Sequence, residues 1–347
     1  MFSASWSLAP DSRLAAAELV RYQRHAANAR WGLLFASGFH QPQWLLSELQ
    51  RLLGHIPLFG GSCCGIITPQ GVEYGGYEAL LLLFDTPVDY GCFSVHDHSG
   101  FARWLADDYA FCLLDLLGQR PEPLLASLNG KQLDGVGLVG DLQMKDSFQF
   151  CGDQVVDNQV IALKLPPPTN RTQTLGTSPI SPPMTVTEAK GNCIYALDGQ
   201  PALDRTLAVS GLDALPPGLL RQLAMGFDWG GSSVCHSLRA VDSQQGTLTL
   251  GTGQVTVGQT LQLMRRDSDA GRAKTAQILT QCHTDRPSFY IECMGRTAML
   301  TGASEEDATV LAAHLGERLV GILSGAELLS QQGQSKLVNW AGTLLQW

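Results

Sequence analysis

An internal repeat constrains the fold of this 347-residue chain more than any other feature of its sequence. Residues 31–84 and 288–347 show the same order of predicted elements: strand, small-residue turn, helix, short strand, Gly-rich turn and strand. The run 60–64 of the first copy aligns with the run 321–325 of the second, and each begins with a glycine. We therefore expect a mixed α/β fold of two related lobes, in which helices cover β-sheets. A chance similarity between the two segments is the alternative.

Apolar periodicity predicts the individual elements. Leu45, Leu49, Leu52 and Leu53 lie at helical spacing ahead of Gly54, a residue type that often ends a helix. Strands are predicted at 31–36, 56–59, 79–84 and 88–96, and helices at 11–28, 100–117, 271–281 and 305–319. After residue 129 the sequence changes to short strand-like runs, which indicate a further small sheet.

The Pro-rich stretch 166–183 contains no acidic residue and is expected to be an extended connection on the surface rather than part of the core. From these patterns we predict an N-terminal helix in residues 1–29, followed by two domains at 30–219 and 220–347.

Composition narrows the classes of function. The net charge of −9 disfavours nucleic acid as a partner, because binding phosphates requires clustered Lys and Arg. No apolar run is long enough to insert into a membrane, and residues 1–10 do not resemble a signal peptide, so a cytoplasmic protein is expected. The nine cysteines form no CxxC pair, which favours reduced thiols over a disulfide framework or a structural zinc site.

Common catalytic signatures are absent from the sequence. The run 60–65 lacks the Lys-Ser/Thr of a phosphate-binding loop, and Ser62 lacks the following glycine of a nucleophile elbow. A thiol enzyme with Cys63 or Cys293 as nucleophile and a distant histidine as base remains an alternative. Small residues that pack a tight turn also explain the pair Cys63-Cys64.

Three histidines are candidates for a metal or haem. His96 and His98 are two residues apart on a predicted strand, so their imidazoles would leave the same face. His236 follows Cys235, but neighbouring strand residues face opposite sides, so this pair offers one axial ligand at most. A polar strand end in water explains His96 and His98 equally well.

The run Cys293-Met294-Gly295-Arg296 is the better site candidate, because it directly follows a predicted buried strand. Gly295 would let the backbone approach a ligand, and the guanidinium of Arg296 could bind a carboxylate or phosphate. Glu327 provides an acidic group from the next turn, and a simple ion pair between Arg296 and Glu327 is the alternative. The predicted ligand-binding residues are Gly61, Ser62, Cys63, Cys293, Gly295, Arg296 and Glu327.

These segments together resemble the FIST family. Its N-terminal signature is similar to residues 60–65, 137–141, 160–165, 186–187 and 198–202. Its C-terminal signature is similar to Arg239, residues 257–258, 293–296 and 321–327, and Asn339. Three positions depart from the usual pattern: Cys63 replaces a Thr, Ile66 a Glu, and Ala326 a Gly.

The resemblance implies an intracellular sensory module, not an enzyme, that regulates a signalling protein such as a histidine kinase or a cyclic-di-GMP enzyme. A subset of the family resembles haem-binding nitric-oxide sensors, so haem is an expected cofactor, with His236 or His98 as axial ligand. The alternative is a haem-free sensor of an amino acid or another metabolite. A homodimer is a further expected assembly. Ligand binding is expected to bias a two-state arrangement of the lobes.

Overall fold

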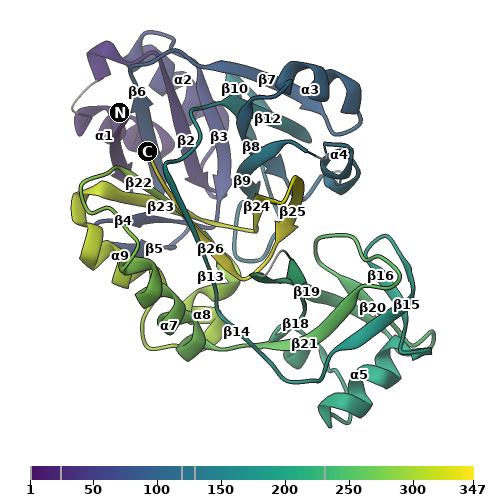
Figure 1. The fold of residues 1–347 in the computed structure, drawn as a ribbon. Helices are drawn as coiled ribbons and strands as arrows, with labels where there is room; N and C mark the ends of the chain where they lie inside the picture. The colour runs from purple at the N-terminus through teal and green to yellow at the C-terminus, as the bar shows by residue number, and fades with distance from the viewer. Residues whose placement is uncertain (1, 24–25, 119, 129, 230–231) are drawn as a thin grey trace.

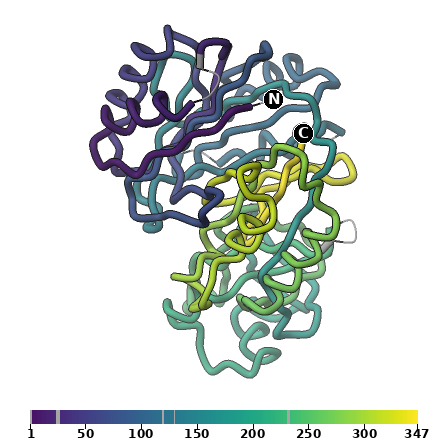
Figure 2. Tube along the Cα trace, turned by 90° about the vertical axis from the view of Figure 1, so that its left-hand side faces the viewer, coloured from purple at the N-terminus to yellow at the C-terminus, as the bar shows by residue number. Residues whose placement is uncertain are grey.

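A larger lobe of three β-sheets and a smaller β-rich lobe make up the molecule, as Figures 1 and 2 show from two directions. The computed structural model describes residues 2–23, 26–118, 120–128, 130–229 and 232–347. In both views the two termini lie on the larger lobe, and the smaller lobe projects from its other end. Within the described part of the chain, every helix is too short or too polar to cross a lipid bilayer.

The larger lobe contains three copies of one unit, in the order strand, helix, strand, helix and four strands. The first copy consists of β1 (Phe2–Ser7), α1 (Ser12–Arg21), β2 (Trp31–Ser37), α2 (Pro42–Leu53), β3 (Leu58–Cys63), β4 (Gly65–Thr68), β5 (Gly71–Glu73) and β6 (Ala79–Phe84). The second consists of β7 (Asp89–Ser94), α3 (His98–Leu105), β8 (Tyr109–Asp115), α4 (Glu122–Ser127), β9 (Gln132–Leu138), β10 (Gln149–Gly152), β11 (Gln154–Val156) and β12 (Gln159–Lys164).

The third copy is interrupted by the smaller lobe. It consists of β13 (Asn170–Leu175), α7 (Ser268–Leu279), β22 (Ser288–Cys293), α9 (Asp307–Leu315), β23 (Leu319–Ser324), β24 (Ala326–Gln331), β25 (Gln334–Val338) and β26 (Ala341–Gln346), with the short helix α8 (Ala298–Thr301) before α9. Short 3₁₀ turns lie at Ala26–Asn28, Met294–Arg296 and Gly316–Arg318. The mixed α/β class and the repeat between 31–84 and 288–347 are thus confirmed, but both copies lie in one lobe together with a third.

Each sheet includes a β-hairpin whose two strands belong to another copy. The sheet orders are β1-β6-β2-β3-β10-β11, β7-β12-β8-β9-β24-β25 and β13-β26-β22-β23-β4-β5. In each copy the two central strands, such as β2 and β3, pair in parallel, and the last strand returns antiparallel to the first of them. The hairpins β10–β11, β24–β25 and β4–β5 therefore tie the three copies into a closed cycle.

The three sheets turn their inner faces toward one shared apolar core. Trp31 and Phe35 of the first copy meet Phe111 of the second and Phe289 of the third in this core. The ring centroids of Phe35 and Phe289 are 5.8 Å apart, and those of Phe111 and Phe289 are 6.3 Å apart. Helices α1 and α2, α3 and α4, and α7 and α9 cover the outer faces of the three sheets.

One glycine marks the same position in every copy. A Cβ atom placed at Gly60 would lie 1.9 Å from the carbonyl oxygen of Leu34. A Cβ atom at Gly135 would lie 2.1 Å from the carbonyl oxygen of Cys112, and one at Gly321 would lie 2.0 Å from that of Tyr290. The second central strand of each sheet can therefore approach the first only where this residue has no side chain. The predicted alignment of Gly60 with Gly321 has this physical basis.

The smaller lobe spans residues 177–266 and is inserted between β13 and α7. It consists of β14 (Thr177–Pro179), β15 (Met184–Lys190), β16 (Cys193–Leu197), β17 (Gln200–Pro201), α5 (Ala202–Ser210), α6 (Pro217–Leu220), β18 (Leu223–Trp229), β19 (Ser232–Asp242), β20 (Thr247–Leu250) and β21 (Thr260–Arg266). Because β18 pairs with both β19 and β21, six antiparallel strands form a closed ring around an apolar core. The predicted boundary between residues 219 and 220 falls inside α6 of this lobe.

Three expectations differ from the structure. The predicted helix 100–117 is wrong, because α3 ends at Leu105 and β8 follows as a buried strand of the second copy. The stretch 166–183 is extended, but it contains β13, which pairs with β26 inside a sheet. Residues 1–29 contain β1 as well as α1, and β1 pairs with β6.

Candidate functional site

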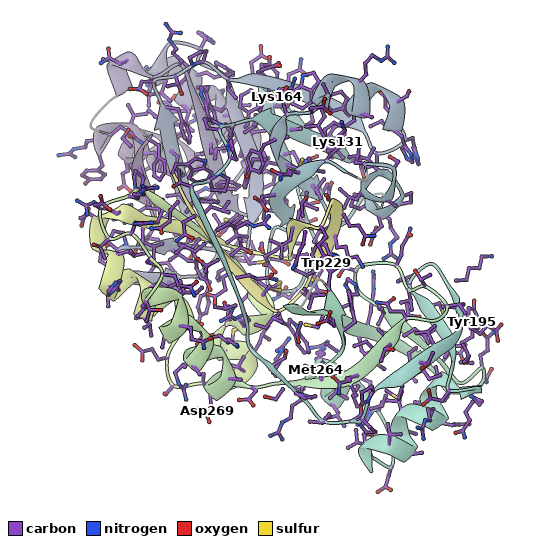
Figure 3. All side chains as sticks on the ribbon, viewed as in Figure 1. Lys131, Lys164, Tyr195, Trp229, Met264 and Asp269 are labelled. Carbon is purple, nitrogen blue, oxygen red and sulfur yellow. The ribbon has the colours of Figure 1, made fainter. Side chains whose placement is uncertain are left out.

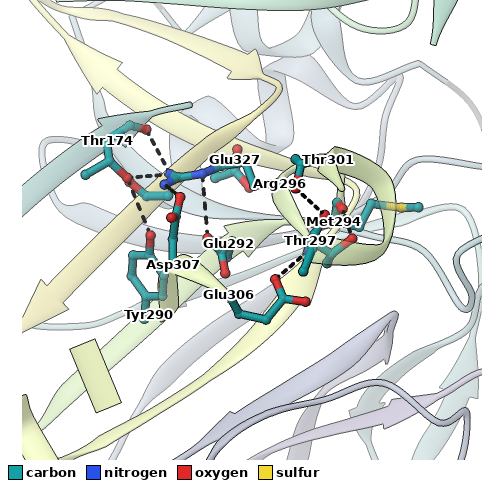
Figure 4. A network of polar contacts seen from close by, with 12 residues as sticks. Thr174, Tyr290, Glu292, Met294, Arg296, Thr297, Thr301, Glu306, Asp307 and Glu327 are labelled. Atoms are coloured by element: carbon teal, nitrogen blue, oxygen red, sulfur yellow. Dashed lines mark hydrogen bonds and ion pairs between the residues drawn. The ribbon is translucent and has the colours of Figure 1, made fainter. Parts of the chain in front are cut away.

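A buried cluster of charged side chains lies where β22 ends near the smaller lobe (Figure 4). The 3₁₀ turn Met294–Arg296 directly follows β22 and directs the Arg296 side chain back into the protein, where the residue is only 5% exposed. Arg296 Nη2 donates to Asp307 Oδ2 at 2.6 Å, and Nη1 donates to the hydroxyl of Thr174 on β13. Arg296 Nε lies 3.6 Å from Glu292 Oε1.

Glu292 is the least satisfied member of this cluster. It is completely buried, and neither of its carboxylate oxygens accepts a hydrogen bond from a residue that the structure describes. Burial raises the pKa of Glu292 to about 8, although the charge of Arg296 acts in the opposite direction and those of Asp307 and Glu306 reinforce the rise. Glu292 therefore holds a proton at neutral pH in this arrangement.

Glu327 is a second buried carboxyl group of the cluster. It lies on β24 and accepts a hydrogen bond from Ser324 Oγ at 2.7 Å. Burial raises the pKa of Glu327 well above its ordinary value, and both the hydrogen bond from Ser324 and the charge of Arg296 oppose that rise. Arg296 forms its ion pair with Asp307, and its other close carboxyl contact among the described residues is with Glu292, so the alternative of an Arg296–Glu327 ion pair is not formed.

The glycine of the predicted motif allows a close approach between the lobes. A Cβ atom at Gly295 would lie 2.3 Å from Cδ1 of Trp340 and 3.4 Å from Nη2 of Arg266, which is the last residue of β21 in the smaller lobe. The guanidinium of Arg266 lies 4.6 Å from the centre of the Trp340 ring, and its Nε has no hydrogen-bond partner among the described residues. Gly295 thus permits a close contact with Trp340, whereas the sequence predicted an approach of its backbone to a ligand.

The predicted residues of the first copy lie elsewhere. Ser62 Oγ accepts a hydrogen bond from the backbone N–H of Phe148, and a Cβ atom at Gly61 would lie 2.3 Å from the carbonyl oxygen of Phe148. Cys63 belongs to the central core. The next residue, Cys64, contacts the turn after β22, with its Sγ atom 3.5 Å from Sδ of Met294. The structure therefore brings Cys293, Gly295, Arg296 and Glu327 together but uses Gly61, Ser62 and Cys63 in packing.

The two candidate nucleophiles, Cys63 and Cys293, are not activated as thiolates. Burial raises the pKa of Cys293 to about 12, and burial also raises the pKa of Cys63. At neutral pH both residues are therefore thiols rather than the thiolates that act as nucleophiles.

The two predicted axial histidines differ in their surroundings. His236 is buried, its Nδ1 lies 3.1 Å from Thr252 Oγ1, and burial lowers the pKa of its imidazole to about 3. Its ring packs closely against the backbone of Gly253, where an added Cβ atom would lie 2.2 Å from Nε2. His98 begins α3 rather than sharing a strand face with His96, because β7 ends at Ser94.

Two cavities lie away from the charged cluster. One, of about 350 Å³, is apolar and lies at the start of β2 and β22, and the other, of about 210 Å³, is lined partly by Asp134 and Arg171. Neither cavity is lined by a histidine. In the described part of the chain, no three His, Cys, Asp or Glu side chains are grouped so that they could hold a metal ion.

Sequence reasoning missed several members of the charged cluster. Asp307 was considered only as a residue at the start of a helix, and Glu292 only as the last residue of a strand. Thr174 lies in the Pro-rich stretch that was expected at the surface, yet its side chain is 1% exposed. An acidic residue inside an otherwise apolar strand, as Glu292 is, was the available signal.

Comparison with known families supports the resemblance seen in the sequence. The model of the FIST N domain matches residues 30–200, and the model of the FIST C domain matches residues 201–330. The two matches meet inside the smaller lobe, within β17. A search of curated proteins found no match. FIST domains are sensory domains of signal transduction. Because the two matches together cover residues 30–330, the chain belongs to the FIST family.

Proposed function

We propose that this protein is a cytoplasmic sensor of a small ligand with an ammonium group, such as an amino acid, and that the ligand binds at the charged cluster between the lobes. The observation that carries the proposal is Glu292, a fully buried carboxyl group that has no hydrogen-bond partner among the described residues. Buried polar groups without partners are rare in proteins, and such a group beside a charged cluster is a common sign of a binding site.

The charges of the cluster favour an ammonium group over an anion. Glu292, Glu327 and Asp307 lie around the single guanidinium of Arg296, which already donates to Asp307. An ammonium group can donate three hydrogen bonds and can replace the proton that burial keeps on Glu292. Ligand binding is then coupled to the release of a proton below pH 8.

Arg266 provides a position for the carboxylate of an amino acid. Its Nε has no partner among the described residues, and the charges of both Arg266 and Glu327 act on the pKa of Cys293, so both groups lie near that residue. Arg266 belongs to the smaller lobe, whereas Glu327 and Glu292 belong to the larger one. A zwitterion held by all three side chains would couple the two lobes.

This coupling is the proposed basis of signalling. The cluster is closed in the present arrangement, so a ligand enters only when the lobes separate, and its contacts then favour one arrangement over the other. The surface that changes would be read by a partner such as a histidine kinase or a cyclic-di-GMP enzyme, as the family resemblance implies. Haem is not part of this proposal, because His236 is buried and neither predicted axial histidine lines either of the two cavities.

Isothermal titration calorimetry with the twenty standard amino acids, each in phosphate and in Tris at pH 7, tests the proposal. One or a few amino acids should bind, and the difference in enthalpy between the buffers should correspond to about one released proton. Glu292→Gln should abolish proton release, and Arg266→Met should weaken binding at least about tenfold, as expected for the loss of a charged hydrogen bond. Glu317→Gln, an exposed residue of the same lobe, is the matched control.

Two results would contradict the proposal. If an amino acid binds without proton release, or equally well to Glu292→Gln, the ligand does not reach the cluster. If no amino acid binds, but added hemin gives a saturable Soret band that disappears in His236→Ala, the haem sensor predicted from the family resemblance is correct instead.

A further inference from the structure

The 350 Å³ cavity lies at the opposite end of β22 from the charged cluster. Its floor is formed by Trp31, Leu33, Phe111 and Phe289, which lie near the start of the first central strand in each of the three copies. All four are at most 4% exposed. The cavity is therefore the open end of the core that the three sheets share.

The cavity has the dimensions and rigidity of a ligand site. Its volume is about 350 Å³, within the range of known small-molecule pockets, which is roughly 300–1,000 Å³. Three prolines, Pro87, Pro166 and Pro287, contribute to its wall, and proline fixes the backbone φ angle. The site is thus preformed and requires no movement of the lobes.

The lining selects flat apolar molecules. Trp31 stacks on Phe84 with ring centroids 3.9 Å apart, and both line the cavity with Phe111 and Phe289. A lining with several aromatic side chains favours aromatic ligands, because their rings can stack on these side chains or contact them edge to face. Engineered apolar cavities of about 150 Å³ hold a benzene molecule, so this one can hold a fused two-ring system.

The charges at the cavity favour a neutral ligand. Among the described residues that line the cavity, Lys164 is the one cation, and it lies on the larger lobe, as Figure 3 shows. The Lys164 ammonium is already 2.8 Å from Asp108 and 3.5 Å from Asp89, and it lies 4.8 Å from the centre of the Trp104 ring. An anionic ligand would have to compete with two carboxylates for this ammonium group.

From the shape, the aromatic lining and the charges together, we propose that the cavity is a second ligand site, which binds a neutral aromatic molecule of about two rings.

Fluorescence titration of the full chain with prodan, a neutral naphthalene ketone, tests this proposal. Prodan should bind saturably at one molecule per chain with a blue-shifted emission. Thr86→Trp places an indole at the exposed rim and should weaken binding at least tenfold, whereas the exposed Thr256→Trp in the smaller lobe should leave it unchanged.

The proposal is overturned if Thr86→Trp binds prodan as the unaltered protein does, or if no saturable binding occurs. It is also overturned if the anionic dye 1-anilinonaphthalene-8-sulfonate binds more tightly than prodan to the same site. Glu292→Gln should bind prodan normally, which separates this site from the proposed amino-acid site.

Discussion

Glu292 determines how the charged cluster responds to pH. The pKa of its carboxyl group is about 8 in the folded chain and 4.5 as its ordinary value. Between these values the folded state holds a proton that the unfolded state has lost, so this group's stabilising effect is complete below pH 4.5 and is lost as pH rises through 8. The free energy of unfolding should therefore fall as pH increases within this window.

Replacement of Glu292 by Gln should remove that dependence. One titrating group changes the free energy of unfolding by at most about 1.4 kcal/mol per pH unit. Urea denaturation of the unaltered protein and of Glu292→Gln between pH 5 and pH 8 should show that the variant has the flatter dependence, and Glu317→Gln should behave as the unaltered protein does. Parallel curves for all three would show that Glu292 is ionised in the folded state.

Individual site residues were predictable only where their neighbours in sequence defined a motif. Gly295, Arg296 and Glu327 were predicted as one site, and the structure places them close together. Thr174 and Asp307 were not recognised, because their proximity to Arg296 depends on the pairing of β13 with β26 and on the packing of α9. Such long-range contacts leave no local pattern in a single sequence.

At the scale of elements, the second central strand of each copy needs a glycine at one position, and this requirement can be tested on β23. Gly321→Ala would place a Cβ atom 2.0 Å from the carbonyl oxygen of Tyr290, so β22 and β23 would have to move apart. We expect a loss of at least about 2 kcal/mol in stability, as for other overpacked core positions. Gly218→Ala, where a Cβ atom meets nothing within 4 Å, should leave the melting temperature nearly unchanged. Equal melting temperatures for both variants would contradict the close approach.

Elements were predicted well where periodicity changed at a clear boundary. Helix α2 ends at Leu53, and Gly54 adopts the left-handed conformation that ends many helices, as expected. Strand β8 was missed because α3 is followed by only a short turn, and both segments are rich in apolar residues. An apolar run alone does not separate a buried strand from a helix. This single error concealed the second copy of the unit and hence the threefold organisation.

At the scale of the whole molecule, the exchanged hairpins make the three copies interdependent. Without the third copy, β9 loses its partner β24, and the hairpin β4–β5 loses β23. A fragment that ends at residue 168 should therefore show no cooperative thermal unfolding and no near-ultraviolet circular dichroism, whereas the full chain should show both. A cooperative transition in the fragment would mean that two copies suffice for a stable core.

The whole arrangement could be predicted only in part. A repeat between 31–84 and 288–347 was evident because Gly60 and Gly321 are constrained by the same close approach. The exchange of hairpins was not, since strand pairing between distant segments depends on matching surfaces rather than on local sequence. The insertion of residues 177–266 into the third copy also left no marker beyond the prolines around it.

The cyclic exchange of hairpins has a consequence for biosynthesis. A ribosome releases the chain from its N-terminus, so β4 and β5 emerge long before β23, the strand that they must join. Until translation reaches the last copy, the first sheet can be completed by β10 and β11, but its own hairpin stays without a partner and exposes strand edges. The hairpin of the first copy therefore reaches its native pairing only after the third copy has been made.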